Sequence, residues 1–199
     1  MICWERKQMN LPNKLTIMRI IMTPIFMLAL LLDFPFHYGI ALILFIVASL
    51  TDMFDGKIAR KQNLITDFGK FLDPLADKML TTAAFLGFIA LNIGYGITWI
   101  VFIVLFREFL VSSLRLVAVS SGGKVIAANI WGKLKTVSQM TAIIFALTAK
   151  QFCEFVNIPM LTSFLDIATS VLLWISAILC VISGAIYLLS NKEAVDPSK

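Results

Sequence analysis

The chain has 199 residues, 59% of them hydrophobic, and a mean hydropathy of +0.90. Soluble domains are about 45–50% apolar, so the composition predicts an integral membrane protein. The net charge of +5 does not indicate nucleic-acid binding, because no basic run is dense enough to follow a phosphate backbone. Cys3, Cys153 and Cys180 are scattered and His37 is the single histidine, which argues against zinc sites and Cys/His nucleophiles.

Residues 1–14 mix polar and apolar side chains, and we expect them to lie on the cytoplasmic membrane interface. Six apolar stretches follow, each close to the ~20 residues that a helix needs to cross a bilayer. No linker divides them, so residues 15–199 are expected to form one all-α domain of six transmembrane helices. The expected spans are 15–32, 38–54, 75–93, 97–119, 134–149 and 167–189.

The breaks between these stretches differ in length and polarity. Residues 33–35 and 92–96 contain proline or glycine and predict tight turns on the outer side. Residues 151–166 are of intermediate polarity, and we expect them to form a longer connection, either interfacial or re-entrant.

The orientation follows from the distribution of lysine and arginine, which gather on the cytoplasmic side of membrane proteins. With six spans and both termini inside, only Lys150 lies near the outer face. The opposite face receives Arg6, Lys7, Lys14, Lys57, Arg60, Lys61, Lys70, Arg115, Lys124, Lys133, Lys135, Lys192 and Lys199. The sequence therefore predicts a multi-pass protein of the cell membrane with cytoplasmic termini.

Four carboxylates lie at the ends of the second and third stretches, where a charge is costly and usually functional. Asp52 and Asp55 are spaced i, i+3, and Asp73 and Asp77 are spaced i, i+4, so each pair shares a helix face. If the chain reverses at 62–65, the two pairs meet and would repel each other unless a cation lies between them. Oxygen ligands favour Mg²⁺, Mn²⁺ or Ca²⁺ over zinc.

Small residues and one arginine accompany these carboxylates. Gly56, Ala59 and Gly69 leave open space beside them, and Arg60 offers a fork for phosphate oxygens. The stretch therefore predicts a metal site with a phosphate-bearing substrate against it.

A second polar group interrupts the fourth stretch and opens the fifth. Arg107 and Arg115 are eight residues apart and share a helix face within about 80°. Arg107 and Glu108 could simply neutralise each other, with the later lysines as membrane anchors, and we adopt that interpretation for Lys124. Several cations with few nearby acids call for an anion such as a phosphate monoester. The predicted anion-binding residues are Arg107, Arg115, Lys133 and Lys135.

The pattern D-x2-D-G-x2-A-R-x8-G-x3-D-x3-D is matched at all eight of its fixed positions, from Asp52 to Asp77. It resembles the signature of the CDP-alcohol phosphatidyltransferases, integral membrane enzymes that use two divalent metals. The Arg107-Glu108-Phe109, Leu114-Arg115 and Gly132-Lys133-Leu134-Lys135-Thr136 segments resemble the phosphatidylglycerophosphate synthase branch, as do residues 10–19, which makes Met9 a candidate start.

The resemblance implies transfer of the phosphatidyl group from CDP-diacylglycerol to sn-glycerol 3-phosphate by a homodimer with its active site facing the cytoplasm. It implies two Mg²⁺ or Mn²⁺ ions on Asp52, Asp55 and Asp73, with Asp77 as a further ligand and as the general base. The donor would contact Asp52, Gly56, Ala59, Arg60 and Gly69. The phosphate of the acceptor would contact Arg107, Arg115, Lys133 and Lys135.

Two alternatives stay open at this point. A cardiolipin synthase of the same superfamily would use phosphatidylglycerol as the acceptor, or another alcohol could take that place. A divalent cation transporter would also carry intramembrane carboxylates, although it would explain neither Arg60 and its small neighbours nor the basic group.

Overall fold

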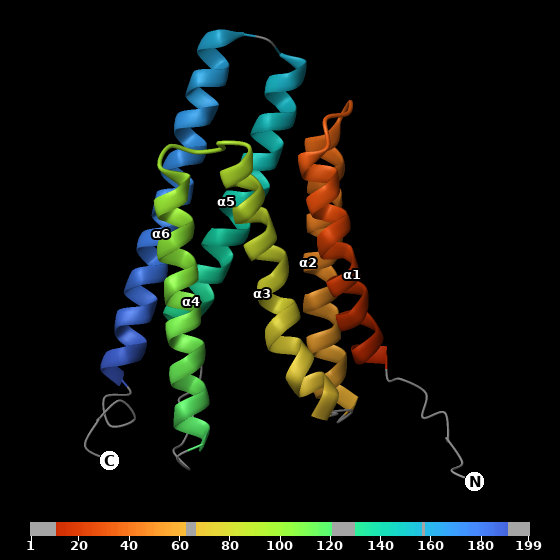
Figure 1. Ribbon diagram of the computed structural model, residues 1–199, viewed down its shortest axis with the longest axis vertical. Helices are drawn as coiled ribbons and strands as arrows, with labels where there is room; N and C mark the ends of the chain where they lie inside the picture. Colours follow the sequence, from red (N-terminus) through yellow and green to blue (C-terminus); the bar gives the residue numbers. More distant parts are fainter. Residues whose placement is uncertain (1–10, 63–66, 121–129, 157, 191–199) are drawn as a thin grey trace. The chain divides into compact units, whose positions relative to one another are not determined.

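The computed structural model describes the backbone of residues 11–62, 67–120, 130–156 and 158–190, and the side chains of 15–51, 76, 78–115, 130–156 and 158–190. These ranges form six α-helices and no strand (Figure 1), which confirms the all-α prediction for the described residues. The helices are α1 (Leu11–Leu31), α2 (His37–Gln62), α3 (Asp67–Ala90), α4 (Ile97–Ser120), α5 (Ile130–Phe155) and α6 (Pro159–Ser190).

The contacts between residues divide the chain into two units, Met1–Ala84 and Phe85–Lys199. The boundary falls inside α3, so a continuous helix rather than a linker joins the units. Residues 11–14, which were expected to belong to the interfacial segment 1–14, begin α1. Residues 1–10 lie outside the described part, and their interfacial position stays a prediction.

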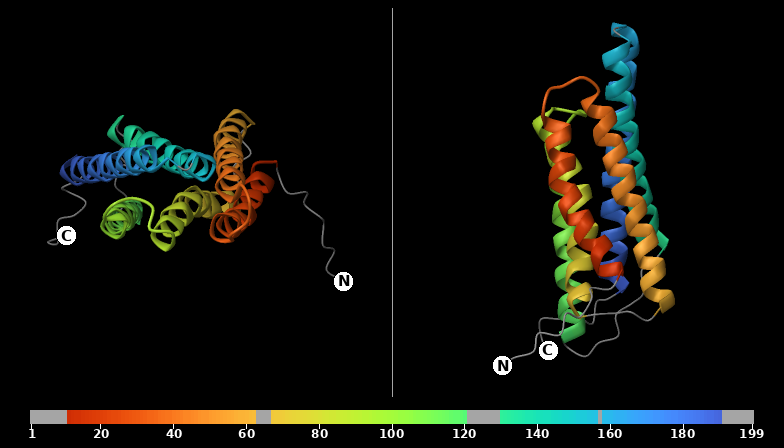
Figure 2. Two further views of the ribbon diagram at one scale, coloured as in Figure 1. Left: turned by 90° about the horizontal axis from the view of Figure 1, so that it is seen from above. Right: turned by 90° about the vertical axis from the view of Figure 1, so that its right-hand side faces the viewer.

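In the first unit, α1 and α2 pack along each other as an antiparallel hairpin (Figure 2). Phe26 and Phe45 are both fully buried and their ring centroids lie 5.8 Å apart, so aromatic packing joins the two helices. The predicted turn at 33–35 is confirmed. His37 opens α2, and its ring Nδ1 donates to the carbonyl oxygen of Leu30 at 3.1 Å, which ties the start of α2 to the end of α1.

In the second unit, α6 packs against both α4 and α5. The turn predicted at 92–96 is confirmed and is attached to α6. The backbone N–H of Tyr95 donates to Ser170 Oγ at 2.9 Å, and Trp174 Nε1 donates to the Tyr95 carbonyl oxygen at 3.0 Å. Gly94 has a φ of +97°, and a Cβ there would lie 2.7 Å from Leu173 Cδ1. Glycine is therefore required for both the backbone conformation and the close approach to α6.

The prediction of a long connection over 151–166 is wrong. Helix α5 continues to Phe155, and α6 begins at Pro159, a residue that suits the first turn of a helix. The polarity that suggested a loop belongs instead to helix ends that pair with each other. Lys150 Nζ lies 2.8 Å from Asp166 Oδ1 across the hairpin, and Gln151 Nε2 donates to Glu154 Oε2 at 2.8 Å within α5.

Two helices in the described residues are long and apolar enough to cross a membrane, over Ile97–Arg115 and Pro159–Ser190. Shorter apolar helical stretches are Leu15–Leu31, His37–Thr51 and Lys78–Ala90. On α4, Phe102, Phe106 and Phe109 recur at helical spacing and are all more than half exposed, which suits contact with lipid rather than water. These features support a membrane protein, whereas six spans and cytoplasmic termini stay predictions.

Candidate functional site

The carboxylate-rich stretch lies on two helices of the first unit. Asp52, Asp55, Gly56, Ala59 and Arg60 belong to the second half of α2. Gly69, Asp73 and Asp77 belong to the first half of α3. Both halves are therefore helical, as the i, i+3 and i, i+4 spacing of the aspartates requires.

The side chains of these eight residues, and the reversal at 63–66, lie outside the described part of the structure. Among the described side chains, no group of three or more His, Cys, Asp or Glu residues gathers to hold a metal. The side chains of the tetrad lie outside that part, so the metal site remains a prediction. Its chemistry fits the expected ions, since carboxylate oxygens are the donors that hard divalent cations prefer.

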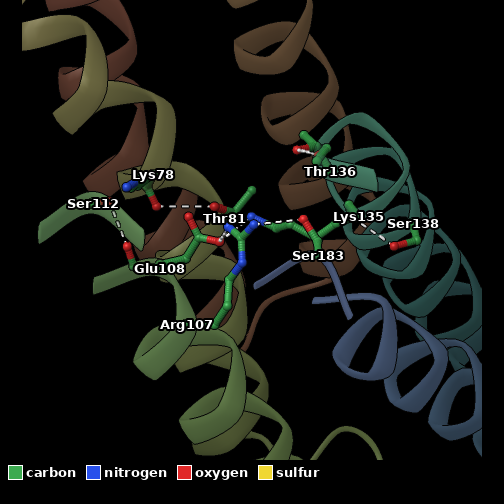
Figure 3. A network of polar contacts seen from close by, with 10 residues as sticks. Lys78, Thr81, Arg107, Glu108, Ser112, Lys135, Thr136, Ser138 and Ser183 are labelled. Carbon is green, nitrogen blue, oxygen red and sulfur yellow. Dashed lines mark hydrogen bonds and ion pairs between the residues drawn. The ribbon is translucent and has the colours of Figure 1, made fainter. Parts of the chain in front are cut away.

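The second unit brings together two of the four predicted anion-binding residues in what we call the Arg107 cluster, made of Arg107, Glu108, Lys135 and Ser183 (Figure 3). Arg107 Nη1 lies 3.0 Å from Glu108 Oε1, and Arg107 Nη2 donates to Ser183 Oγ at 2.8 Å. Lys135 Nζ forms an ion pair with the same Glu108 oxygen. Helices α4, α5 and α6 therefore each contribute to one polar centre.

The cluster is largely removed from solvent. The exposed fractions of the Arg107, Glu108 and Lys135 side chains are 13%, 17% and 9%. Two cations share one carboxylate in these contacts, so the cluster has a formal excess of one positive charge. An excess charge in weakly solvated surroundings is costly, and a bound anion would offset it.

Two buried donors strengthen this interpretation. Arg107 Nε and Gln139 Nε2 are buried and have no hydrogen-bond partner among the described atoms. Gln139 lies one turn after Lys135 on α5 and is 4% exposed. Buried donors are usually satisfied, so unpaired ones of this kind suit an oxygen-rich ligand. The positive charge and the unpaired donors of the centre suit an anion with several acceptor oxygens.

Arg115 and Lys133 lie outside this cluster. Both side chains are exposed. Lys133 is two residues from the buried Lys135, and on a helix that spacing places two side chains on different faces. The structure therefore divides the predicted set into a pair with little exposure, Arg107 and Lys135, and an exposed pair, Arg115 and Lys133.

The sequence pattern did not identify Ser183 and Gly184, which approach Arg107 from α6, or Gln139, which is buried one turn after Lys135 on α5. All three are uncharged, and Ser183 lies 76 residues from Arg107. In the first unit, α1 carries a buried polar stripe at helical spacing, made of Thr16, Arg19 and Thr23. An arginine inside the apolar run 15–32 was the available signal for this stripe.

Comparison with known proteins identifies the family. Residues 9–183 match the CDP-alcohol phosphatidyltransferase family. A protein of Bacillus subtilis (strain 168), named CDP-diacylglycerol–glycerol-3-phosphate 3-phosphatidyltransferase, is 42% identical over 95% of this chain and 98% of its own. A protein of the same name in Rickettsia bellii is 37% identical over 92% of this chain and 96% of its own. Another in Haemophilus influenzae is 36% identical over 90% of this chain and 91% of its own. The chain belongs to the CDP-alcohol phosphatidyltransferase family.

Proposed function

We propose that this chain transfers the phosphatidyl group of CDP-diacylglycerol to sn-glycerol 3-phosphate, giving phosphatidylglycerophosphate and CMP. The observation that carries the proposal is the similarity over 95% of the chain to the Bacillus subtilis relative that is named for this reaction. The Arg107 cluster supports the choice of acceptor, because buried positive charge and unpaired donors suit a phosphate monoester.

For the acceptor, Arg107 and Lys135 would hold the phosphate of glycerol 3-phosphate from α4 and α5. A guanidinium can offer two parallel N–H donors, whereas the lysine ammonium acts as a point charge. Arg115 and Lys133 are exposed, so they would attract the dianion from water toward Arg107 and Lys135.

For the donor, residues of α2 and α3 would contact the CDP group. Gly56, Ala59 and Gly69 would let the nucleotide approach the helices closely, since none of them carries a bulky side chain. Arg60 would hold the diphosphate, and Asp52 would contribute beside it. Asp77 would accept the proton of the attacking glycerol hydroxyl, provided that it is ionised when the substrates are bound.

Asp52, Asp55, Asp73 and Asp77 would hold two divalent cations, Mg²⁺ or Mn²⁺. When bound, such ions would neutralise the charge that develops on the diphosphate and on the departing CMP. Exhaustive chelation of the purified enzyme should therefore abolish CMP release, and Mg²⁺ or Mn²⁺ should restore it. Full activity in the chelator would contradict the metal site and leave the family assignment intact.

We further propose that the protein crosses the cell membrane six times, faces the cytoplasm with its active site and acts as a homodimer. The apolar helices support a membrane location. The cytoplasmic site follows from the excess of lysine and arginine on the side that carries the aspartates.

The test of the proposed reaction is a comparison of acceptors. Purified enzyme in detergent with CDP-diacylglycerol and Mg²⁺ should release CMP with glycerol 3-phosphate, and much less with plain glycerol or phosphatidylglycerol. Equal release with plain glycerol would show that the phosphate is not recognised. Preference for phosphatidylglycerol would instead identify a cardiolipin synthase.

A further inference from the structure

We propose that Ser183 and Gly184 of α6 are positioning residues that hold Arg107 in the orientation needed for the acceptor phosphate. The inference rests on the proposed function, in which Arg107 binds glycerol 3-phosphate. It adds a third helix to an acceptor site that the sequence motifs locate only on α4 and α5.

Ser183 fixes one end of the guanidinium. Its hydroxyl oxygen accepts a hydrogen bond from Arg107 Nη2 at 2.8 Å, and the residue is 4% exposed. The other end is held by Glu108, whose Oε1 lies 3.0 Å from Nη1. Because the two contacts come from different helices, the guanidinium plane is held at both terminal nitrogens and cannot rotate freely (Figure 3).

Gly184 makes room for the stem of the same side chain. A Cβ at this position would lie 2.9 Å from Arg107 Cγ and 3.5 Å from Arg107 Nε. Glycine inside a helix costs roughly 1 kcal/mol relative to alanine, so its place in α6 needs a reason. At Gly132, by contrast, an added Cβ would meet none of the described atoms within 4 Å. The close approach of Arg107 is a sufficient reason at Gly184.

The fixed orientation leaves donors for a ligand. A guanidinium has five N–H groups, and the two contacts just described use one on each terminal nitrogen. Arg107 Nε is buried without a partner among the described atoms. Ser183 and Gly184 therefore hold the arginine while its remaining N–H groups stay available to phosphate oxygens.

Two substitutions test the two contacts separately. Ser183→Ala removes the anchor on Nη2, and Gly184→Ala forces the stem of Arg107 to shift, because a Cβ would lie 2.9 Å from its Cγ. A net hydrogen bond of about 1 kcal/mol corresponds to roughly fivefold, so each should raise KM for glycerol 3-phosphate about three- to tenfold. The KM for CDP-diacylglycerol should stay at the wild-type value, since Arg107 does not hold the donor.

The matched control is Ser176→Ala. Ser176 is also buried in α6, but its hydroxyl donates to the carbonyl oxygen of Leu173 in its own helix at 2.7 Å. This variant loses the same atoms without touching Arg107, so both KM values should remain unchanged. Ser183→Thr keeps a hydroxyl at the tested position and should retain most of the wild-type affinity for glycerol 3-phosphate. If Ser183→Ala does not accumulate in the membrane, KM can still be measured for Ser183→Thr.

A double-mutant cycle with Arg107→Ala decides whether the serine and glycine act through the arginine. If they do, adding Ser183→Ala or Gly184→Ala to Arg107→Ala should leave kcat/KM for glycerol 3-phosphate unchanged from Arg107→Ala alone. Suppose that Arg107→Ala raises KM for glycerol 3-phosphate selectively. The positioning role would then be overturned by additive losses of kcat/KM in the double mutants, or by wild-type KM values in both α6 variants. If Arg107→Ala does not raise KM for glycerol 3-phosphate selectively, the proposed acceptor site itself is wrong.

Discussion

Glu108 is the carboxylate that joins the two cations of the Arg107 cluster. Its Oε1 pairs with both Arg107 and Lys135, which would otherwise repel each other in weakly solvated surroundings. The interpretation that Arg107 and Glu108 merely neutralise each other is therefore incomplete, because Lys135 competes for the same oxygen. Among the described side chains, one carboxylate pairs with two cations, so these three groups carry a net positive charge.

Glu108→Gln should consequently destabilise the protein while keeping its volume. Removing one partner of a fully buried pair costs roughly 3–5 kcal/mol, and the slight exposure of this cluster reduces that figure. Thermal unfolding in detergent should show a lower Tm, and glycerol 3-phosphate should raise the Tm more than it does in the wild type, because the phosphate replaces the lost negative charge.

The control for this change is Asp166→Asn, which breaks the ion pair between Lys150 and Asp166. Those side chains are 25% and 39% exposed, and exposed pairs contribute about 0–1 kcal/mol. Its Tm should therefore stay close to that of the wild type. A Tm for Glu108→Gln that is equally unaffected would mean that the cluster does not need its carboxylate.

Asp77→Asn tests the proposed general base at the same scale. The amide keeps the volume of the side chain but cannot take up the hydroxyl proton, so turnover should fall much more than binding of CDP-diacylglycerol. Single-turnover CMP release and equilibrium binding of the donor measure the two effects. Asp33→Asn, in the exposed turn between α1 and α2, is the matched control. Equal loss of binding and turnover would make Asp77 chiefly a metal ligand.

At the scale of helices, apolar runs predicted the elements well because a membrane-crossing helix needs a long uninterrupted stretch. The predicted span 97–119 agrees with α4, which covers Ile97–Ser120. Proline and glycine correctly predicted the turns after α1 and α3. The run 167–189 missed the start of α6 at Pro159, because polarity alone cannot distinguish a loop from helix ends that pair across a hairpin.

Only some residues of the Arg107 cluster could be recognised from the sequence. Charged residues in apolar surroundings are rare, so Arg107 and Lys135 were recognisable from the sequence. Ser183 and Gly184 were not, because small uncharged residues occur throughout the apolar run of α6. Their role depends on the packing of α4 against α6, a contact between segments far apart in the chain.

The turn between α3 and α4 depends on Gly94 for its stability. Gly94→Ala should lower the Tm, since alanine is strained at a φ of +97° and its Cβ would meet Leu173 Cδ1 at 2.7 Å. The backbone strain alone costs about 1–3 kcal/mol. Gly132→Ala, where an added Cβ meets no atom of the described residues within 4 Å, should leave the Tm unchanged or raise it. Adding Leu173→Ala to Gly94→Ala should not restore the Tm, because the strained φ remains.

At the scale of the whole molecule, the open point is how the helices cross the membrane. Among the described helices, α5 is less continuously apolar than α4 and α6, yet its charged residues gather toward its two ends. Lys133 and Glu154 are both exposed and lie 21 residues apart. At 1.5 Å per residue this is about 32 Å, enough to place them on opposite sides of a hydrocarbon core of about 30 Å.

The six-span topology therefore predicts that Lys133 faces the cytoplasm and Glu154 faces outward. In a background with Cys3→Ser, Cys153→Ser and Cys180→Ala, a membrane-impermeant maleimide should label Glu154→Cys in intact cells. It should label Lys133→Cys only after lysis. Labelling of both positions from the same side would mean that α5 does not cross the bilayer. The distribution of lysine and arginine would then no longer support a cytoplasmic acceptor site. The contacts among Arg107, Glu108 and Lys135 do not depend on the topology and would be unaffected.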